Sequence, residues 1–245
     1  MPEIDKETDH AFNVLKGKKI FFGHHSVGQN IVSGLQKINS QVSEESRINI
    51  IYSCNPEDYD GALFGHAVVG YNYKPESKNI WFSNFMDNLR QWSPDCAFYK
   101  YCYVDIDKST NVEKLFQDYV DNMQMLKDKY PNTTFIHFTS PLTVLQDGLK
   151  AKVKKLIGRS IGIEENRKRT EYNELLRQRF RGIEPLFDLA EVESTPTHTV
   201  VKDRKGDNYQ SLSTEYSSDG GHLNERGRSV VAIHLVKYLA KLVNV

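Results

Sequence analysis

"FFGHHSVGQN", residues 21–30, places two histidines and a serine where an apolar run gives way to an amphipathic stretch. The apolar run is typical of a buried strand, and apolar residues recur at helical spacing from Val27 to Ile38. Ser26 is therefore predicted to lie at a strand-to-helix turn. The free N–H groups and the dipole of a helix start favour a developing negative charge, which suits a nucleophile in acyl transfer. Capping of the helix is the other role open to this serine.

Short apolar runs and longer amphipathic stretches alternate along the rest of the chain. Strands are predicted at residues 18–23, 47–53, 95–106, 133–140 and 184–190. Helices are predicted at residues 26–39, 79–92, 111–130, 143–181 and 224–242, and a β-hairpin at 198–213 around Lys205, Gly206 and Asp207. Residues 54–78 show only weak periodicity. The alternation predicts an α/β fold with a parallel sheet between helices, whose ligands bind beyond the carboxyl ends of the strands.

The composition narrows the class of protein. A chain of 245 residues suits one α/β domain over residues 1–245. Its 32 basic residues balance 32 acidic ones, which argues against a nucleic-acid partner. No apolar run approaches the roughly 18 residues of a membrane span, and the charged start lacks the apolar stretch of a signal peptide. We expect a cytoplasmic protein as the chain stands, or a periplasmic or secreted one if a leader was removed.

Cofactor and metal motifs are missing from the sequence. Three cysteines form no C-x-x-C pair, so we expect reduced and mostly buried thiols. The sequence contains no G-x-G-x-x-G, no Walker A motif and no H-E-x-x-H, and we expect neither a cofactor nor a metal. A metal-dependent hydrolase built on His24, His25, His66 and Asp219 is disfavoured, because no two of these residues have the spacing of a metal-ligand pair.

A second candidate group lies near the other end of the chain. In "SSDGGHLNERGR", residues 217–228, Asp219 precedes His222 by three residues in a Gly-rich turn before the last predicted helix. The two glycines allow a tight turn, so the carboxylate can reach the imidazole Nδ1 and orient the ring as a general base for Ser26. His25 is poorly placed for that task, because neighbouring side chains on an extended segment diverge. A turn residue followed by a helix start is the simpler interpretation of this motif.

These residues resemble the SGNH hydrolases, an esterase and lipase superfamily also called GDSL. "GHHSVG" corresponds to the first block of the family and "DGGH" to its D-x-x-H motif. The resemblance implies a flavodoxin-like three-layer α/β/α sandwich with a five-stranded parallel sheet. It also implies a triad of Ser26, His222 and Asp219. Together with "FYKYCYVDI" and "FIHFTSPLT", the chain resembles a bacterial branch that carries GHHS.

The oxyanion hole departs from the family pattern. The resemblance assigns it the backbone N–H groups of Ser26 and Gly70, and a third donor from a G-x-N-D block after the third predicted strand. Here that block reads "CYVD", so Cys102 and Val104 replace the glycine and the asparagine, while Asp105 remains. Removal of one such donor typically lowers the rate by about 100- to 1000-fold.

Other polar residues complete the expected site. Asn72 and Lys100 are the candidates for the missing donor, with Asn72 preferred. His25 should hold the turn through a hydrogen bond to nearby backbone. The expected substrate-binding residues are His24, His66, Lys100 and Asp105. A buried, hydrogen-bonded state is the alternative for the two histidines.

The leading hypothesis is a serine esterase that removes an acyl group from a carbohydrate or another small polar ester. Acetyl is the acyl group that we expect. Tyr71, Tyr73 and Trp81 would stack on sugar rings, or would pack in the core. The alternative is a binding protein that keeps the fold but lacks a complete oxyanion hole, as "CYVD" suggests. The oligomeric state is left open.

Overall fold

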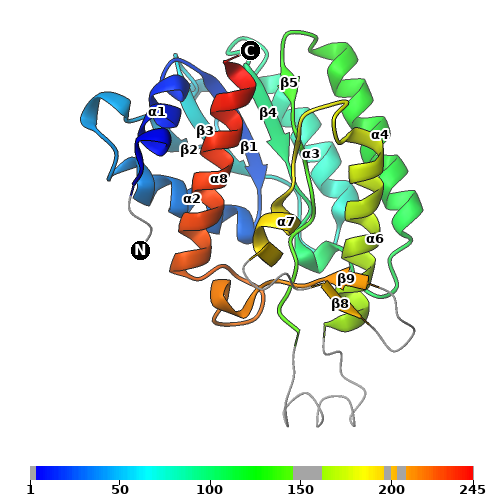
Figure 1. Cartoon of the computed structure of the whole chain (residues 1–245). Coiled ribbons are helices and arrows are strands. Elements are labelled where there is room, and N and C mark those ends of the chain that lie inside the picture. The colour runs from blue at the N-terminus through cyan, green and yellow to red at the C-terminus, as the bar shows by residue number, and fades with distance from the viewer. Residues whose placement is uncertain (1–3, 146–161, 196–199, 203–207, 245) are drawn as a thin grey trace.

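The computed structural model describes residues 4–145, 162–195, 200–202 and 208–244. Its centre is a five-stranded parallel sheet in the order β2-β3-β1-β4-β5 (Figure 1). The strands are β1 Lys19–His24, β2 Ile50–Tyr52, β3 Leu63–Val68, β4 Cys96–Tyr99 and β5 Thr134–Phe135. The strand order changes direction at β1, which pairs with β3 on one side and β4 on the other. The carboxyl end of β1 is therefore where a sheet of this kind binds its ligands.

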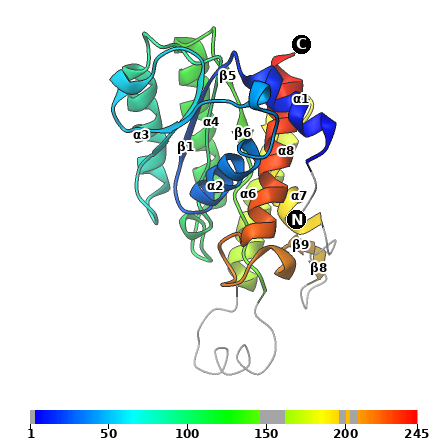
Figure 2. The same ribbon diagram turned by 90° about the vertical axis from the view of Figure 1, so that its left-hand side faces the viewer.

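The described helices cover both faces of the sheet. They are α1 Lys6–Leu15, α2 Val27–Asn39, α3 Pro75–Asn88, α4 Val112–Lys129, α6 Ile163–Phe180, α7 Leu189–Ser194 and α8 Glu225–Val243. Figure 2 shows α1, α2 and α8 on one side of β1 and α3 on the other, and the buried residues of α4 pack with those of α3. The buried residues of α7 pack with the first group and those of α6 with the second. The predicted three-layer α/β/α sandwich is confirmed. No described helix is both long and apolar enough to cross a membrane.

Two smaller strand pairs complete the described part of the chain. β6 His137–Phe138 pairs in parallel with β7 Leu186–Phe187. Only Ile136 separates β5 from β6, and its N–H donates to Ala97 O at 3.1 Å, so β6 and β7 extend the main sheet. β8 Val200–Lys202 and β9 Asn208–Gln210 form an antiparallel pair. The predicted hairpin is thus confirmed, whereas its turn at 203–207 lies outside the described residues.

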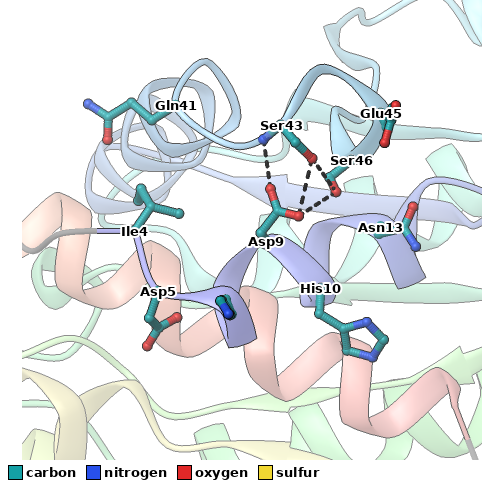
Figure 3. A pocket seen from close by; sticks show the side chains of 10 residues that line it. Ile4, Asp5, Asp9, His10, Asn13, Gln41, Ser43, Glu45 and Ser46 are labelled. Atoms are coloured by element: carbon teal, nitrogen blue, oxygen red, sulfur yellow. Dashed lines mark hydrogen bonds between the residues drawn. The ribbon is translucent and has the colours of Figure 1, made fainter.

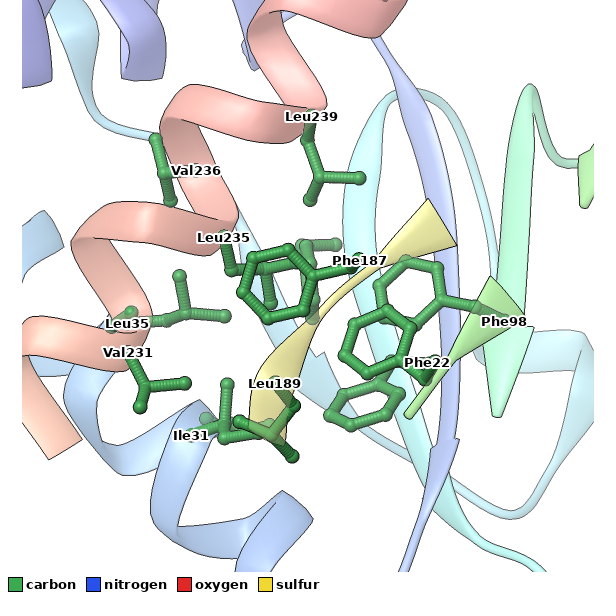
Figure 4. Close-up of a cluster of buried hydrophobic side chains, with 14 of the residues drawn as sticks. Phe22, Ile31, Leu35, Phe98, Phe187, Leu189, Val231, Leu235, Val236 and Leu239 are labelled. Carbon is green, nitrogen blue, oxygen red and sulfur yellow. The ribbon is translucent and has the colours of Figure 1, made fainter. Parts of the chain in front are cut away.

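A row of contacting aromatic rings crosses the sheet on the face of α2 and α8. Phe22, Phe98, Phe138 and Phe187 follow one another across adjacent strands, with ring centroids 4.8 to 4.9 Å apart. Leucine, isoleucine and valine side chains of α2 and α8 close over this row (Figure 4). Rings at these separations contribute about 0.5–1.5 kcal/mol per pair beyond burial of area. The row therefore joins the central strands to β7 and to the helices that carry the candidate site.

Several predicted elements differ from the observed ones. β3 lies within the segment for which no element was predicted, because Gly65 and His66 interrupt its apolar pattern. Gly65 leaves room for the ring of Tyr59, which packs against it. The strand predicted at 95–106 ends at Tyr99, and the strand predicted at 184–190 ends at Phe187, where α7 soon follows. Helix α1 was not predicted. Of the helix predicted at 143–181, residues 146–161 lie outside the described part.

Helices α2 and α8 cross in close contact at Gly34. A Cβ atom added to Gly34 would overlap the backbone carbonyl oxygen of Arg228 and would press on the Cβ of Ala232 at 3.0 Å. Only glycine permits this separation of the two helix axes. The crossing matters for the site because α2 begins just after Ser26 and α8 begins three residues after His222.

We predict that Gly34→Ala lowers the free energy of unfolding by about 1–3 kcal/mol, because the two helices must separate to admit the methyl group. Gly17→Ala is the matched control, since a Cβ there meets no atom within 4 Å. It should change stability by less than about 1 kcal/mol. Urea denaturation of both variants measures the difference. Equal stability of the two variants would contradict the close crossing.

Candidate active site

Ser26 sits at a strained turn between β1 and α2. Its φ of 44° and ψ of −101° place it in a region that residues other than glycine rarely adopt. It occupies the N-cap position of α2, but its side chain makes no capping hydrogen bond. The interpretation of Ser26 as a helix cap is therefore wrong. Its Oγ lies instead 2.6 Å from Nε2 of His222, which is 196 residues away in the sequence.

Asp219 fixes the tautomer of His222. The Asp219 Oδ2 lies 2.7 Å from the ring Nδ1 of His222. A carboxylate only accepts hydrogen bonds, so Nδ1 carries the ring proton and Nε2 accepts from the Ser26 hydroxyl. Burial raises the pKa of the Asp219 carboxyl. The backbone N–H groups of Gly221 and His222 and the His222 ring outweigh this effect, and the pKa falls well below its usual range. Asp219 is therefore an ionised partner of the imidazole.

Residues that the sequence analysis missed hold the loop of His222 against α2. Asn30 Oδ1 accepts a hydrogen bond from the N–H of Leu223 at 3.1 Å. Ser217 Oγ donates to His222 O at 2.7 Å and accepts from the N–H of Gly220 at 2.9 Å. The position of Asn30, one helical turn after Ser26, is the one signal in the sequence that could have pointed to it.

The loop after β3 brings Gly70 next to the turn of Ser26. The N–H of Val69 donates to His24 O at 3.2 Å, and His25 Nε2 donates to Gly70 O at 2.7 Å. The predicted role of His25, a hydrogen bond from its ring to nearby backbone, is thus confirmed. The N–H groups of Ser26 and Gly70 donate to none of the described residues. Two donors without a partner among the described residues therefore lie at the turn of Ser26 and on the loop that contacts this turn.

Gly70 is required at its position, and Asn72 follows in the same loop. Gly70 has a φ of 66°, and a Cβ there would lie 2.6 Å from the backbone nitrogen of Lys78. Asn72 is half-buried, and its Oδ1 lies 3.5 Å from the Lys78 ammonium. No described residue accepts a hydrogen bond from its amide nitrogen. The loop thus carries a backbone N–H and a side-chain amide nitrogen that donate to none of the described residues.

The structure buries the side chains of the four residues that we expected to bind substrate. These residues are His24, His66, Lys100 and Asp105. His24 Nε2 and His66 Nδ1 form a hydrogen bond of 3.0 Å. Lys100 Nζ contacts Cys102 Sγ at 3.8 Å, and Asp105 forms an ion pair with Lys78. The two histidines therefore form a buried pair, in which His24 Nδ1 and His66 Nε2 have no partner among the described residues.

A cleft with a cavity of about 360 Å³ begins at Asp219. The rings of Tyr73 and Tyr103 and the guanidinium of Arg169 line it together with the Gly-rich turn of Asp219. Tyr103 also packs edge-on against the His222 ring, with centroids 5.8 Å apart. The cleft therefore opens directly beside the candidate triad.

Three aromatic side chains stand exposed on the neighbouring loop and on α3. Tyr71, Tyr73 and Trp81 are 55%, 75% and 44% exposed, so the alternative of core packing does not hold for them. The rings of Tyr71 and Trp81 meet edge to face at 5.3 Å. They form a small exposed aromatic surface, and Tyr71 directly follows Gly70.

Another pocket lies at the opposite end of α2, between α1 and the segment after α2 (Figure 3). Its centre is Asp9, which accepts hydrogen bonds from the Ser43 N–H at 2.6 Å and the Ser46 hydroxyl at 2.8 Å. The 13 residues of α2 separate it from Ser26, a length of about 20 Å at 1.5 Å per residue. This pocket therefore has no part in the candidate triad.

Of the histidines considered as metal ligands, His24 and His66 contact each other, and His25 has a different partner. The three free cysteines are divided between exposed Cys54 and buried Cys96 and Cys102, as the sequence predicts. Among the described residues, no three side chains of His, Cys, Asp or Glu group as metal ligands would. His25 and His24 hydrogen-bond to different partners, Gly70 O and His66.

The buried histidines make stability depend on pH. Burial lowers the pKa of His66 and His137 to about 4, from an ordinary value of 6.5. Below pH 6.5 the unfolded chain binds protons that the folded chain excludes. We predict that the free energy of unfolding falls from pH 6.5 to pH 4, by up to roughly 1.4 kcal/mol per pH unit and histidine.

Denaturation of His66→Gln across this pH range measures the effect. The variant should lose stability less steeply than the unmodified chain, whatever its stability at neutral pH. His10→Gln is the control, because His10 is exposed on α1, and it should keep the original slope. An unchanged slope in His66→Gln would contradict the prediction.

Comparison with known proteins supports the architecture. No protein-family model and no curated protein matches the sequence. The structure is similar to a GDSL-like lipase from Bacteroides thetaiotaomicron VPI-5482, with a TM-score of 0.52, 10% identity, and coverage of 100% of this chain and 92% of the lipase. It is also similar to a peptidoglycan O-acetylesterase, with a TM-score of 0.50 and 15% identity. That match covers 75% of this chain but only 48% of the esterase. The chain therefore has the fold of the SGNH hydrolases, the superfamily of the GDSL-like lipases.

Proposed function

We propose that the protein is a serine hydrolase of carboxylic esters. Ser26 is the nucleophile, His222 the general base, and Asp219 the residue that orients the imidazole. The observation that carries the proposal is the relay from Ser26 Oγ to His222 Nε2 at 2.6 Å and from His222 Nδ1 to Asp219 Oδ2 at 2.7 Å. A serine in a strained turn, with such a base and with unpaired N–H groups beside it, has the arrangement that acyl transfer needs.

In the first half of the reaction, Ser26 Oγ attacks the ester carbonyl carbon while His222 Nε2 takes the hydroxyl proton. Asp219 stabilises the imidazolium that forms. The carbonyl oxygen becomes an oxyanion, and the N–H groups of Ser26 and Gly70 and the amide nitrogen of Asn72 donate to it. When this intermediate collapses, the bond to the leaving oxygen breaks, and His222 gives the proton to the alcohol.

In the second half, water hydrolyses the acyl group on Ser26. His222 takes a proton from the water as its oxygen attacks the acyl carbon. It returns the proton to Ser26 Oγ when the carboxylic acid leaves, which regenerates the enzyme.

The surroundings of Ser26 favour a small acyl group on a polar alcohol, and we propose an acetyl ester of a carbohydrate. The exposed rings of Tyr71, Tyr73 and Trp81 suit stacking against a sugar. The side chain of Tyr103 lines the cleft beside Asp219, and its hydroxyl suits hydrogen bonding to the hydroxyls of such an alcohol. The substrate then lies across the triad, with the sugar on the aromatic side.

A catalytically inactive binding protein is the second candidate, because Val104 stands where the family has an asparagine donor. A short-chain p-nitrophenyl ester separates the candidates. The serine hydrolase should release p-nitrophenol at a rate that Ser26→Ala abolishes and that a chelator leaves unchanged. No release above the Ser26→Ala background would favour the binding protein. A rate lost with chelator and restored by zinc would favour a metal-dependent enzyme.

We further predict that Ser26 and His222 act as one unit. Ser26→Ala and His222→Ala should each lower kcat/KM by about 10⁴- to 10⁶-fold, and the double variant should be no worse than either. Asp219→Asn should retain about 10- to 100-fold more activity, because Asp219 only orients and stabilises the imidazolium. Kinetics on one ester measure these values. Ser33→Ala, whose hydroxyl donates only to Gln29 O on the exposed side of α2, is the control.

Circular dichroism checks that each variant is folded. The triad assignment predicts effects of Ser26→Ala and His222→Ala that do not multiply in the double variant. Effects that multiply would mean that the two residues act independently, and the assignment would be wrong.

A further inference from the structure

Lys78 is a buried cation on the apolar face of α3. It shares this face with Phe82 and Met86, one and two turns further along the helix, and its side chain is fully buried. The ammonium lies 2.6 Å from Asp105 Oδ2 and donates to Tyr71 O at 2.9 Å and to Asn72 Oδ1 at 3.5 Å. Two of its three donors are thus directed at the loop after β3, and the third is directed at Asp105.

Asp105 connects Lys78 to the backbone on both sides of the site. It ends the short 3₁₀ helix Tyr103–Asp105, and its side chain is fully buried. Its Oδ1 accepts from the N–H of Tyr73 at 2.9 Å, and its Oδ2 accepts from the N–H of Cys102 at 2.6 Å. A buried ion pair is tolerated only when hydrogen bonds satisfy its remaining atoms, and these contacts do so.

Two more contacts close these interactions into a ring. The Cys102 thiol, whose pKa burial raises, donates to His25 O at 3.6 Å. The ring of His25 in turn donates to Gly70 O at 2.7 Å. The path therefore runs from His25 through Gly70 and the Tyr71 carbonyl to Lys78, then through Asp105 and Cys102 back to His25. Gly70 is a member of this ring and Ser26 directly follows His25, and the N–H groups of both donate to none of the described residues.

Lys78 also decides which way the amide of Asn72 faces. An ammonium group only donates, so the amide oxygen must face Lys78. The amide nitrogen consequently faces away from Lys78, and no described residue accepts from it. Tyr73, the next residue, has a φ of 64° and is held by Asp105, so the loop is fixed on both sides of Asn72.

We propose that Lys78 and Asp105 are positioning residues of the oxyanion hole, and this inference rests on the serine hydrolase function proposed above. The ion pair holds the loop so that the Gly70 N–H and the Asn72 amide nitrogen both face the carbonyl oxygen of the substrate. Asn72 thereby supplies the third donor, which in the family pattern comes from an asparagine at the position of Val104. Lys78 and Asp105 act through the loop and do not contact the substrate.

The test compares an ester with the thionoester in which sulfur replaces the carbonyl oxygen. Sulfur is a larger and weaker hydrogen-bond acceptor, so an oxyanion hole favours the oxygen ester, and this preference measures the hole itself. Asn72→Ala and Lys78→Met should each lower kcat for the ester by about 100-fold with little change in KM. Both should also lower the ratio of ester to thionoester rates. Lys114→Met, which breaks an exposed ion pair with Asp118 on α4, should change neither value.

Two further variants keep the test decisive. Lys78→Met should cause much less loss in the Asn72→Ala background than in the unmodified chain, because Lys78 acts through Asn72. If Lys78→Met alone does not fold, Lys78→Met with Asp105→Asn leaves no unpaired buried charge and should show the same lowered ratio. Asn72→Asp should keep the contact with Lys78 and still lose the preference for oxygen.

The two proposals fail in different ways. An active chain whose Asn72 and Lys78 variants keep the original ester to thionoester ratio would overturn this inference alone. A folded chain without hydrolysis that depends on Ser26 would overturn the proposed function, and this inference with it.

Discussion

Helices α2 and α8 are in close contact where Gly34 of α2 meets Arg228 and Ala232 of α8. This crossing places Ser26, which precedes α2, within 2.6 Å of His222, which precedes α8. The hydrogen bond from Leu223 N–H to Asn30 Oδ1 secures the same junction from the side of α2. The row of phenylalanines on β1, β4, β6 and β7 packs against both helices on one face of the sheet. The candidate site is therefore built on packed helices and strands.

The parallel sheet supplies the other half of the site. Because β1, β3 and β4 run in the same direction, the loops that follow them meet at one edge. Strain and buried charge are concentrated there. Two of the three described non-glycine residues with positive φ, Ser26 and Tyr73, lie at this edge, and the buried Lys78–Asp105 ion pair contacts the loop of Tyr73. Such features lower the free energy of unfolding, and they persist where many surrounding contacts hold the backbone and the charges in place.

The sequence predicted the layers, the position of Ser26 and the partnership of Asp219 with His222, because each depends on local signals. A strand-to-helix junction and a Gly-rich D-x-x-H turn are both short-range features. The contacts of His24 and His66 were not predictable in the same way. Their burial depends on β1 continuing through His24 and on β3 lying beside it, and β3 has no clear pattern of its own. Lys78 was missed although it shares a helical face with Phe82 and Met86, which is the signal of a buried cation.

The central claim is that Ser26 is a nucleophile activated by His222, and labelling with a fluorophosphonate probe tests it most directly. The probe forms a covalent bond only with an activated serine hydroxyl. Peptide mass spectrometry of the intact chain should locate a single adduct on Ser26, and His222→Ala should abolish it while the protein remains folded. An adduct on another residue, or no adduct under conditions that label a control esterase, would contradict the account.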